Sequence, residues 1–382
     1  MSEKNANLPK VNADEILDGI DRWVEIESPS YQGETVNRMA DLVEDGMRTI
    51  GGEIERRPGW DGIGDTLIAR TPWGGDEPGI LVLSHLDTVH PLGTIDGVLP
   101  MARDGDKVFG PGCYDMKGGA YLGYYAYRHL VRAGKTTPLP ITFLYAPDEE
   151  IGSHTSRDLI EREAKKAKYV LVTEPARDGG KVVTSRKGSA DYELSITGRP
   201  SHAGANHDKG RSAIREMARQ ILDIEAMTDY SRGITTNVGV INGGTRSNVV
   251  PADCSAEIDL RFMDPAGAEE MCGRLESLTA YDTDVEMVVS GGMNRPAFDK
   301  NDGITRLFEH ARSLAAEIGF ELEECETSGG VSDGNFTAAL GVPTLDGLGV
   351  DGAGAHTNHE HFYYSSLEPR AQLMIRLLET LE

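Results

Sequence analysis

Residues 79–87 read Gly-Ile-Leu-Val-Leu-Ser-His-Leu-Asp, and this segment is the strongest indication of the fold class. Its uninterrupted apolar run is typical of a strand that is buried on both faces of a parallel sheet. His85 and Asp87 follow directly, so two side chains that can bind metal or move protons stand where the strand ends. Ligands of open α/β sheets bind beyond the carboxyl ends of the strands. The stretch therefore predicts an α/β sheet with a functional site at that edge.

The flanking sequence alternates helical and buried-strand patterns. Apolar residues at helical spacing predict helices around residues 16–24 and 36–47, and a third helix is expected over about 117–133. Two further apolar runs, 141–146 and 169–173, read as buried strands. Helices that alternate with buried strands indicate an α/β layer architecture.

The pattern changes at about residue 187 and changes back after Arg295-Pro296. Between these points we expect a strand (191–198), a helix (211–227), two strands (234–241, 255–262), a helix (266–278) and a strand (285–290). This β-α-β-β-α-β order predicts a ferredoxin-like unit. The α/β pattern then resumes with a helix around 304–314, a strand at 343–348 and a helix at 367–381. We therefore predict a mixed-sheet α/β domain over 1–186 and 296–382, with an inserted α+β domain over 187–295.

Bulk composition excludes several classes of protein. A chain of 382 residues exceeds what one core usually supports. The formal charge of −24, from 62 acidic and 38 basic residues, disfavours a nucleic-acid or anionic-membrane partner. The four cysteines form no CxxC pair, the N-terminus lacks an apolar signal core, and no apolar run is long enough to cross a bilayer. These features predict a cytoplasmic protein that binds neither nucleic acid nor membrane.

Further residues of the same chemical kind follow other predicted strands or lie in glycine-rich loops. They are Asp115 in the loop 110–119, Glu149 and Glu150 after the strand 141–146, Glu174 after the strand 169–173, and His356 in the run Gly352-Ala-Gly-Ala-His356. Each has an ordinary explanation alone: Asp115 would cap a helix, and paired glutamates would begin a solvated one. Their recurrence at successive strand ends instead predicts a metal centre.

The residue types suit a pair of divalent cations. Zinc accepts imidazole and carboxylate ligands, and two histidines with three carboxylates would hold two ions about 3.5–4 Å apart. A bridging ligand belongs on a tight loop, which favours Asp115. One glutamate of the pair 149–150 can bind metal while its neighbour acts as a base. Asp87 is placed to orient the His85 imidazole.

Several motifs in family-like order carry a resemblance. They are Ser84-His-Leu-Asp-Thr-Val89, Gly110–Gly119, Asp148-Glu-Glu-Ile-Gly152, Val172-Thr-Glu-Pro175, Arg186-Lys-Gly188, Gly198-Arg-Pro-Ser-His-Ala-Gly204, Asn248-Val-Val-Pro251 and the segment that ends at His356. The chain resembles the zinc exopeptidase and deacylase family that includes bacterial glutamate carboxypeptidase, acetylornithine deacetylase and succinyl-diaminopimelate desuccinylase. The resemblance implies a catalytic domain with an inserted lid domain.

The resemblance also assigns roles at the metal centre. It implies that His85 and Glu174 bind one ion, that Glu150 and His356 bind the other, that Asp115 bridges them, and that Glu149 is the general base. It implies a cis peptide bond before Met116. The neighbouring histidines His359 and His361 are interpreted as non-ligands, and His90 as structural or exposed.

In the lid, the resemblance implies that His202 reaches the partner subunit's site and donates to the oxyanion of the transition state. That role implies a homodimer formed through the lids. A substrate carboxylate needs a basic or amide group, and Asn248 and Arg295 are the candidates.

The predicted activity is di-zinc hydrolysis of an amide bond next to a carboxylate, such as release of a C-terminal glutamate-like residue from a small peptide or N-acyl amino acid. Co²⁺ or Mn²⁺ could replace Zn²⁺ at these ligands. An N-acyl amino acid deacylase of the acetylornithine or succinyl-diaminopimelate type is the alternative within the same chemistry. A non-catalytic relative that binds peptides is a third possibility, which the retained Glu149 argues against.

Overall fold

The computed structural model describes residues 8–75 and 77–382, and the chain divides into two compact units. The first unit comprises the chain up to Ser185 together with Lys300–Ser328 and Ser332–Glu382. The second comprises Arg186–Asp299 with the short segment Gly329–Val331. The second unit thus includes all of the residues 187–295 that the sequence pattern sets apart. Within the described residues, none of the helices combines the length and apolarity needed to cross a membrane.

The first unit is built on a six-stranded mixed sheet. Its strands, in spatial order, are β1 (Glu53–Arg57), β2 (Thr66–Arg70), β6 (Ile141–Ala146), β3 (Gly79–His85), β7 (Ala167–Val172) and β14 (Thr344–Leu345). The four strands from β6 to β14 are parallel, whereas β1 and β2 add antiparallel pairs at one edge. The prediction of a mixed-sheet α/β fold is confirmed.

Strand β3 is buried along its whole length because its alternate residues enter two different cores. Ile80 and Val82 pack into a core shared with the helices α1 (Ala13–Val24), α2 (Gly33–Thr49), α3 (Gly118–Arg132), α7 (Asp302–Ile318) and α9 (Leu367–Thr380). Leu81 and Leu83 pack on the opposite face with α4 (Arg157–Ala164) and α8 (Gly334–Ala339). Period-two side-chain alternation therefore explains why the strand reads as one continuous apolar run.

A small antiparallel sheet in the first unit joins segments far apart in the chain. Its strands, in order, are β15 (Gly352–Ala353), β16 (His361–Tyr363), β5 (Lys107–Phe109) and β4 (Ala102–Asp104). The pairing of β5 with β16 brings the start of the loop 110–117 next to the loop 354–360. The sequence pattern does not predict this sheet, and the strand expected over 343–348 is only the two residues of β14.

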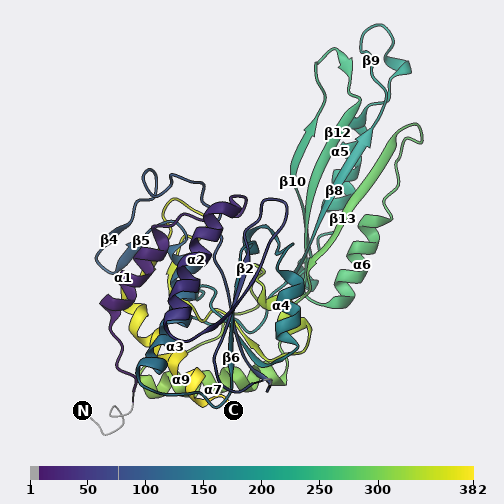
Figure 1. The fold of residues 1–382 in the computed structure, drawn as a ribbon. Coiled ribbons are helices and arrows are strands. Elements are labelled where there is room, and N and C mark those ends of the chain that lie inside the picture. The colour runs from purple at the N-terminus through teal and green to yellow at the C-terminus, as the bar shows by residue number, and fades with distance from the viewer. Residues whose placement is uncertain (1–7, 76) are drawn as a thin grey trace. The chain divides into compact units, whose positions relative to one another are not determined.

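The second unit is a four-stranded antiparallel sheet with two helices. The strand order is β10 (Thr235–Gly243), β12 (Asp253–Phe262), β8 (Gly188–Thr197) and β13 (Glu286–Arg295), as Figure 1 shows. The helices α5 (Ala213–Glu225) and α6 (Pro265–Glu276) contribute side chains to the same core as alternate residues of the strands. A two-stranded ribbon of β9 (Ser201–His202) and β11 (Val249–Val250) adds to this unit. In chain order, the four main strands and two helices follow the predicted β-α-β-β-α-β pattern.

Candidate metal centre

Three neighbouring strands deliver polar side chains to one edge of the large sheet. His85 is the last residue of β3, the short helical turn Glu149–Ile151 follows β6, and Glu174 lies two residues beyond β7. The parallel registers place His85 beside Ala146 of β6 and Leu83 beside Val172 of β7. The strands therefore end side by side, and the residues that follow them converge.

Asp115 lies between the two histidines. Its Oδ1 atom is 3.4 Å from Nε2 of His85, and its Oδ2 atom is 3.5 Å from Nε2 of His356. His85 Nε2 is also 3.6 Å from Oε1 of Glu174, and His356 Nε2 is 3.1 Å from Oε2 of Glu150. The structure thus brings all five predicted ligands together, as two groups that share one carboxylate.

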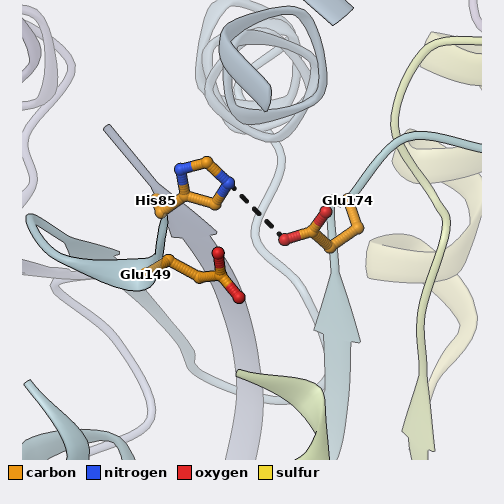
Figure 2. Close-up of side chains that lie close together, drawn as sticks. All are labelled: His85, Glu149 and Glu174. Carbon is orange, nitrogen blue, oxygen red and sulfur yellow. Dashed lines mark ion pairs between the residues drawn. The ribbon is translucent and has the colours of Figure 1, made fainter. Parts of the chain in front are cut away.

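Glu149 lies in the same cluster. Ligand-type atoms of His85, Glu149 and Glu174 all lie within 4.8 Å of one another, and the same limit holds for His85, Asp115 and Glu150. Figure 2 shows the side chains of His85, Glu149 and Glu174 pointing toward one another. Adjacent glutamates of one turn therefore both reach the centre.

Two buried ligand-type atoms indicate that the cluster suits cations. Among residues 8–75 and 77–382, Nε2 of His85 and Oε1 of Glu150 are buried without a hydrogen-bond partner. Buried polar atoms without partners are costly, by about 1–3 kcal/mol each. A set of imidazole nitrogens and carboxylate oxygens is the set that zinc accepts. The residues present therefore fit divalent cations.

Crowding of negative charge shifts the pKa values of the acidic residues. Burial, with the nearby charge of Asp115, raises the pKa of Glu150 to about 8. The same two causes raise the pKa of Glu174 well above its usual value. Burial also acts to raise the pKa of Asp115, but its contacts with the imidazoles of His356 and His85 outweigh burial and lower it. A cluster of this kind requires compensating positive charge.

The two histidines respond in the opposite direction. Burial acts to lower the pKa of His85, but its contacts with the carboxylates of Asp115 and Asp87 outweigh burial and raise it. Hydrogen bonds to Asp115 and Glu150 raise the pKa of His356 to about 11. The carboxylates of the cluster therefore favour positive charge beside both imidazoles.

Asp87 contacts both His85 and the glutamate turn. The shorter contact of His85 Nδ1 is with the main-chain oxygen of Asp87 at 2.9 Å, whereas Oδ1 of the carboxylate is 3.4 Å away. The carboxylate accepts the N–H groups of Glu149 and Glu150, each at 3.1 Å. It also accepts the hydroxyl of Ser30 at 2.6 Å. Asp87 therefore positions the turn as well as the imidazole, a role that the sequence pattern does not reveal.

The loop that carries Asp115 has a special backbone. The peptide bond Asp115–Met116 is cis, as the family resemblance implies. Gly112 has a φ of 69°, and a Cβ atom there would lie 2.4 Å from Cγ2 of Thr88. Glycine is therefore required at this position.

A buried glutamate outside the predicted set contacts the same loop. Glu360 accepts the main-chain N–H groups of Gly112, Tyr114 and Asp115. Sequence reasoning missed it because its partners lie about 245 residues away in the chain, and a glutamate between two histidines carries no local pattern. His90, interpreted as structural or exposed, is buried and bonded to this glutamate at 2.6 Å.

The two histidines near His356 stay outside the cluster. His359 is exposed. His361 is buried, its Nδ1 atom is 2.8 Å from the main-chain oxygen of His359, and its ring packs against Phe109. Neither residue belongs to the group around Asp115.

Two lid candidates, His202 and Asn248, lie together in the second unit. His202 is exposed, and its Nδ1 atom accepts the N–H groups of Gly204 at 3.1 Å and Ala205 at 3.2 Å. It pairs with Val249 of β11, and the main-chain oxygen of Asn248 accepts the N–H of Ala203 at 2.9 Å. The ribbon of β9 and β11 therefore joins these two candidates.

Arg295 lies at the other end of the same sheet. It ends β13, is buried and pairs with Ser189 at the start of β8. The ribbon with His202 follows the opposite end of β8, at Thr197, and Figure 1 shows β9 beyond that end. The strand between Ser189 and Thr197 spans about 26 Å at ~3.3 Å per residue. Within one unit, Arg295 and Asn248 therefore cannot hold the same small carboxylate.

Comparison with known proteins identifies relatives over nearly the whole chain. Residues 81–380 match the peptidase family M20/M25/M40. Carboxypeptidase G2 of Pseudomonas sp. (strain RS-16) is 30% identical over 94% of this chain and 87% of its own. A succinyl-diaminopimelate desuccinylase of Acinetobacter baylyi is 28% identical over 83% of this chain and 86% of its own.

Solved structures share the fold. An M20 family metallo-carboxypeptidase of Sulfolobus solfataricus matches with a TM-score of 0.76 and 17% identity, over 96% of this chain and 99% of its own. The aminopeptidase PepT of Bacillus cereus matches with a TM-score of 0.74 and 23% identity, over 97% of this chain and 98% of its own.

Proposed function

The chain belongs to the peptidase family M20/M25/M40 and is a metallohydrolase, and on this premise we propose that it cleaves an amide bond next to a free carboxylate. The product would be a C-terminal glutamate-like residue released from a small peptide or N-acyl amino acid. The similarity to carboxypeptidase G2 supports the release of a C-terminal residue. The observation that carries the proposal is Asp115, whose two oxygens each face a different histidine.

We propose that two divalent cations occupy this centre. His85 and Glu174 would hold one, Glu150 and His356 the other, and Asp115 both. When bound, the cations would supply Lewis acidity that polarises the substrate carbonyl and makes water more acidic. Zn²⁺ is the first candidate, and Co²⁺ or Mn²⁺ fits the same donors.

Glu149 is the proposed general base. Its carboxylate would take a proton from the attacking water and return it to the amide nitrogen as the C–N bond breaks, so that a carboxylic acid and an amine leave. The Asp87 carboxylate holds the main chain of the turn on which Glu149 lies. Proton transfer requires this fixed position, because the donor and acceptor must lie within hydrogen-bonding distance.

We propose that His202 donates a hydrogen bond to the developing oxyanion. Its Nδ1 atom is occupied as an acceptor of two N–H groups, so in the neutral ring Nε2 carries the hydrogen. Such a donor stabilises the negative charge of the transition state.

The substrate carboxylate is assigned to Arg295 and Asn248 within a homodimer. These residues lie near opposite ends of one sheet, in which the β8 segment from Ser189 to Thr197 spans about 26 Å. A shared substrate would therefore contact Arg295 of one subunit and the ribbon of the other, with dimerisation through the second unit. A cytoplasmic location completes the proposal, supported by four cysteines that form no disulfide.

A deacylase is the second candidate, because desuccinylases are also relatives. It would release the acyl group from an N-acyl amino acid such as N-acetylornithine or N-succinyl-diaminopimelate. The chemistry at the centre would be the same, so only the preferred substrate separates the two candidates.

The test compares wild type and Glu149→Gln on N-acyl-glutamates, glutamyl-terminated dipeptides, N-acetylornithine and N-succinyl-diaminopimelate. Wild type should contain two ions per chain and prefer the glutamate substrates, and Glu149→Gln should lower kcat about 10²- to 10⁴-fold with unchanged metal content. The control is Glu193→Gln, at an exposed glutamate of β8. Preference for N-acetylornithine or the succinyl substrate would establish the deacylase instead. Two bound ions without hydrolysis of any substrate would contradict both.

A further inference from the structure

Glu360 is a buried carboxylate whose bonding capacity is filled by the loop of Asp115. Its Oε1 atom accepts the N–H groups of Tyr114 and Asp115, both at 2.9 Å. Its Oε2 atom accepts the N–H of Gly112 at 3.1 Å and lies 2.6 Å from Nε2 of His90. A carboxylate has about four lone-pair positions, so each one has a donor here. The side chain is 1% exposed.

The donors show what this carboxylate does. Three of the four are main-chain amides of residues 112–115, which converge on one anion in the manner of an anion-binding nest. Main-chain donors fix the path of the backbone, and one of them belongs to Asp115 itself. The bonds to Glu360 therefore set where the Asp115 side chain begins.

Glu360 lies on the same short loop as His356. Glu360 lies four residues after His356, on a loop closed by main-chain hydrogen bonds from Thr357 to Gly354 at 3.1 Å and from Glu360 to Thr357 at 3.3 Å. One short loop thus supplies His356 and also holds the backbone of Asp115. The Oδ2 atom of Asp115 lies 3.5 Å from Nε2 of His356.

We propose that Glu360 is a positioning residue that sets Asp115 relative to His356, with His90 acting through Glu360. The inference rests on the proposed function, because it takes Asp115 and His356 as ligands of a cation pair. Carboxylates one step removed from metal ligands typically change metal affinity about 10- to 100-fold when they are replaced.

The decisive variant is Glu360→Gln, which keeps the size of the side chain but offers one acceptor oxygen to four donors. Metal-free protein, prepared with a chelator, is titrated with Zn²⁺ in competition with a chromophoric chelator. Wild type should bind two ions, and Glu360→Gln should bind them about 10- to 100-fold more weakly. Hydrolytic activity should return as Zn²⁺ is raised, because Glu360 itself does not touch the substrate.

Glu216→Gln is the matched control. Glu216 is also buried and accepts two main-chain N–H groups, from Tyr281 at 2.8 Å and Asp282 at 3.2 Å, but it lies in the second unit. It should lose thermal stability and bind Zn²⁺ as wild type does. A purely structural Glu360 would behave in the same way, so equal Zn²⁺ affinity of Glu360→Gln and wild type would overturn the inference.

A second variant serves if Glu360→Gln does not fold. His90→Ala removes one of the four donors and should weaken Zn²⁺ binding in the same direction by a smaller factor. In a soluble variant that carries both changes, His90→Ala should not weaken Zn²⁺ binding beyond the effect of Glu360→Gln alone. Unchanged affinity in His90→Ala, with Glu360→Gln unfolded, would also overturn the inference. Failure of wild type to bind two ions would instead overturn the proposed function itself.

Discussion

The central strands of the two units place their charged residues in opposite ways. Every residue of β3 is buried, and the candidate ligand His85 stands at its last position. Strand β8 alternates, with Tyr192 and Leu194 buried and Asp191 and Glu193 exposed. A strand covered on both faces has no place for charge except beyond its end, whereas a strand covered on one face solvates charge along its length.

The difference explains why the candidate metal centre lies in the first unit. Burial on both faces concentrates carboxylates past the strand ends, in a dry setting where their interactions are strong. On the second sheet, acidic residues stand opposite each other on a more exposed face: Asp191 is opposite Asp259, which forms an ion pair with Arg261, and Glu193 is opposite Glu257. Acidic residues are gathered in both places, but only the first set converges with histidines.

Metal removal should have the largest effect of these changes, and it should lower the stability of the first unit more than that of the second. A chelator should abolish hydrolysis and destabilise the first unit, since ions present at 1,000 times their Kd stabilise a folded protein by about 4 kcal/mol. All three tryptophans, Trp23, Trp60 and Trp73, lie in the first unit. The unfolding temperature measured by tryptophan fluorescence should therefore fall when the chelator is added, and Zn²⁺ should restore it. A transition unaffected by the chelator would contradict the site.

Truncation of one side chain in each sheet should show how much more a strand residue contributes to stability when it is buried. Leu83→Ala removes a buried side chain of β3 and should destabilise the first unit by about 2–5 kcal/mol. Val288→Ala on β13, where the residue is 50% exposed, should change stability by less than about 0.5 kcal/mol. Urea unfolding followed by fluorescence and circular dichroism measures both. An equal loss of unfolding free energy in the two variants would contradict the difference in burial between the two strands.

Charge reversal on the exposed face should give the smallest effect. Glu257→Lys replaces a like-charge pair with Glu193 by an opposite-charge pair, and it should stabilise the second unit by about 0.2–1 kcal/mol. Circular dichroism in urea measures the gain. Because salt screens exposed charges, the gain should shrink in 1 M NaCl. A loss of stability at low salt would contradict it.

Sequence alone predicts the elements whose pattern is governed by burial. The expected strand 141–146 coincides with β6, and the strand expected over 79–84 is one residue shorter than β3. The apolar runs of these strands reflect packing on both faces, so they are visible without any knowledge of neighbours. His85, Glu150 and Glu174 follow from the same signal because they are placed by strand ends, whereas Asp115 and His356 are indicated by glycine-rich loops.

Features held by main-chain contacts are not visible in this way. The small sheet escapes prediction because β4, at residues 102–104, is exposed throughout and three residues long. Sequence patterns do not predict the roles of Glu360 and Ser30, because the partners of these residues are distant in the chain. Arg295 and Asn248 are adjacent to motifs in sequence but lie near opposite ends of a sheet, which only the strand pairing reveals.

The order in which the chain is made follows from the position of the second unit between β7 and α7. A ribosome completes His85, Asp115, Glu150 and Glu174 early, then synthesises residues 186–299 before it reaches His356 and Glu360. Strand β14 and the loop around His356 emerge only after the inserted unit. A nascent chain that has finished its inserted unit thus still lacks one histidine of the candidate metal centre, so that centre can be completed only after the inserted unit has been made.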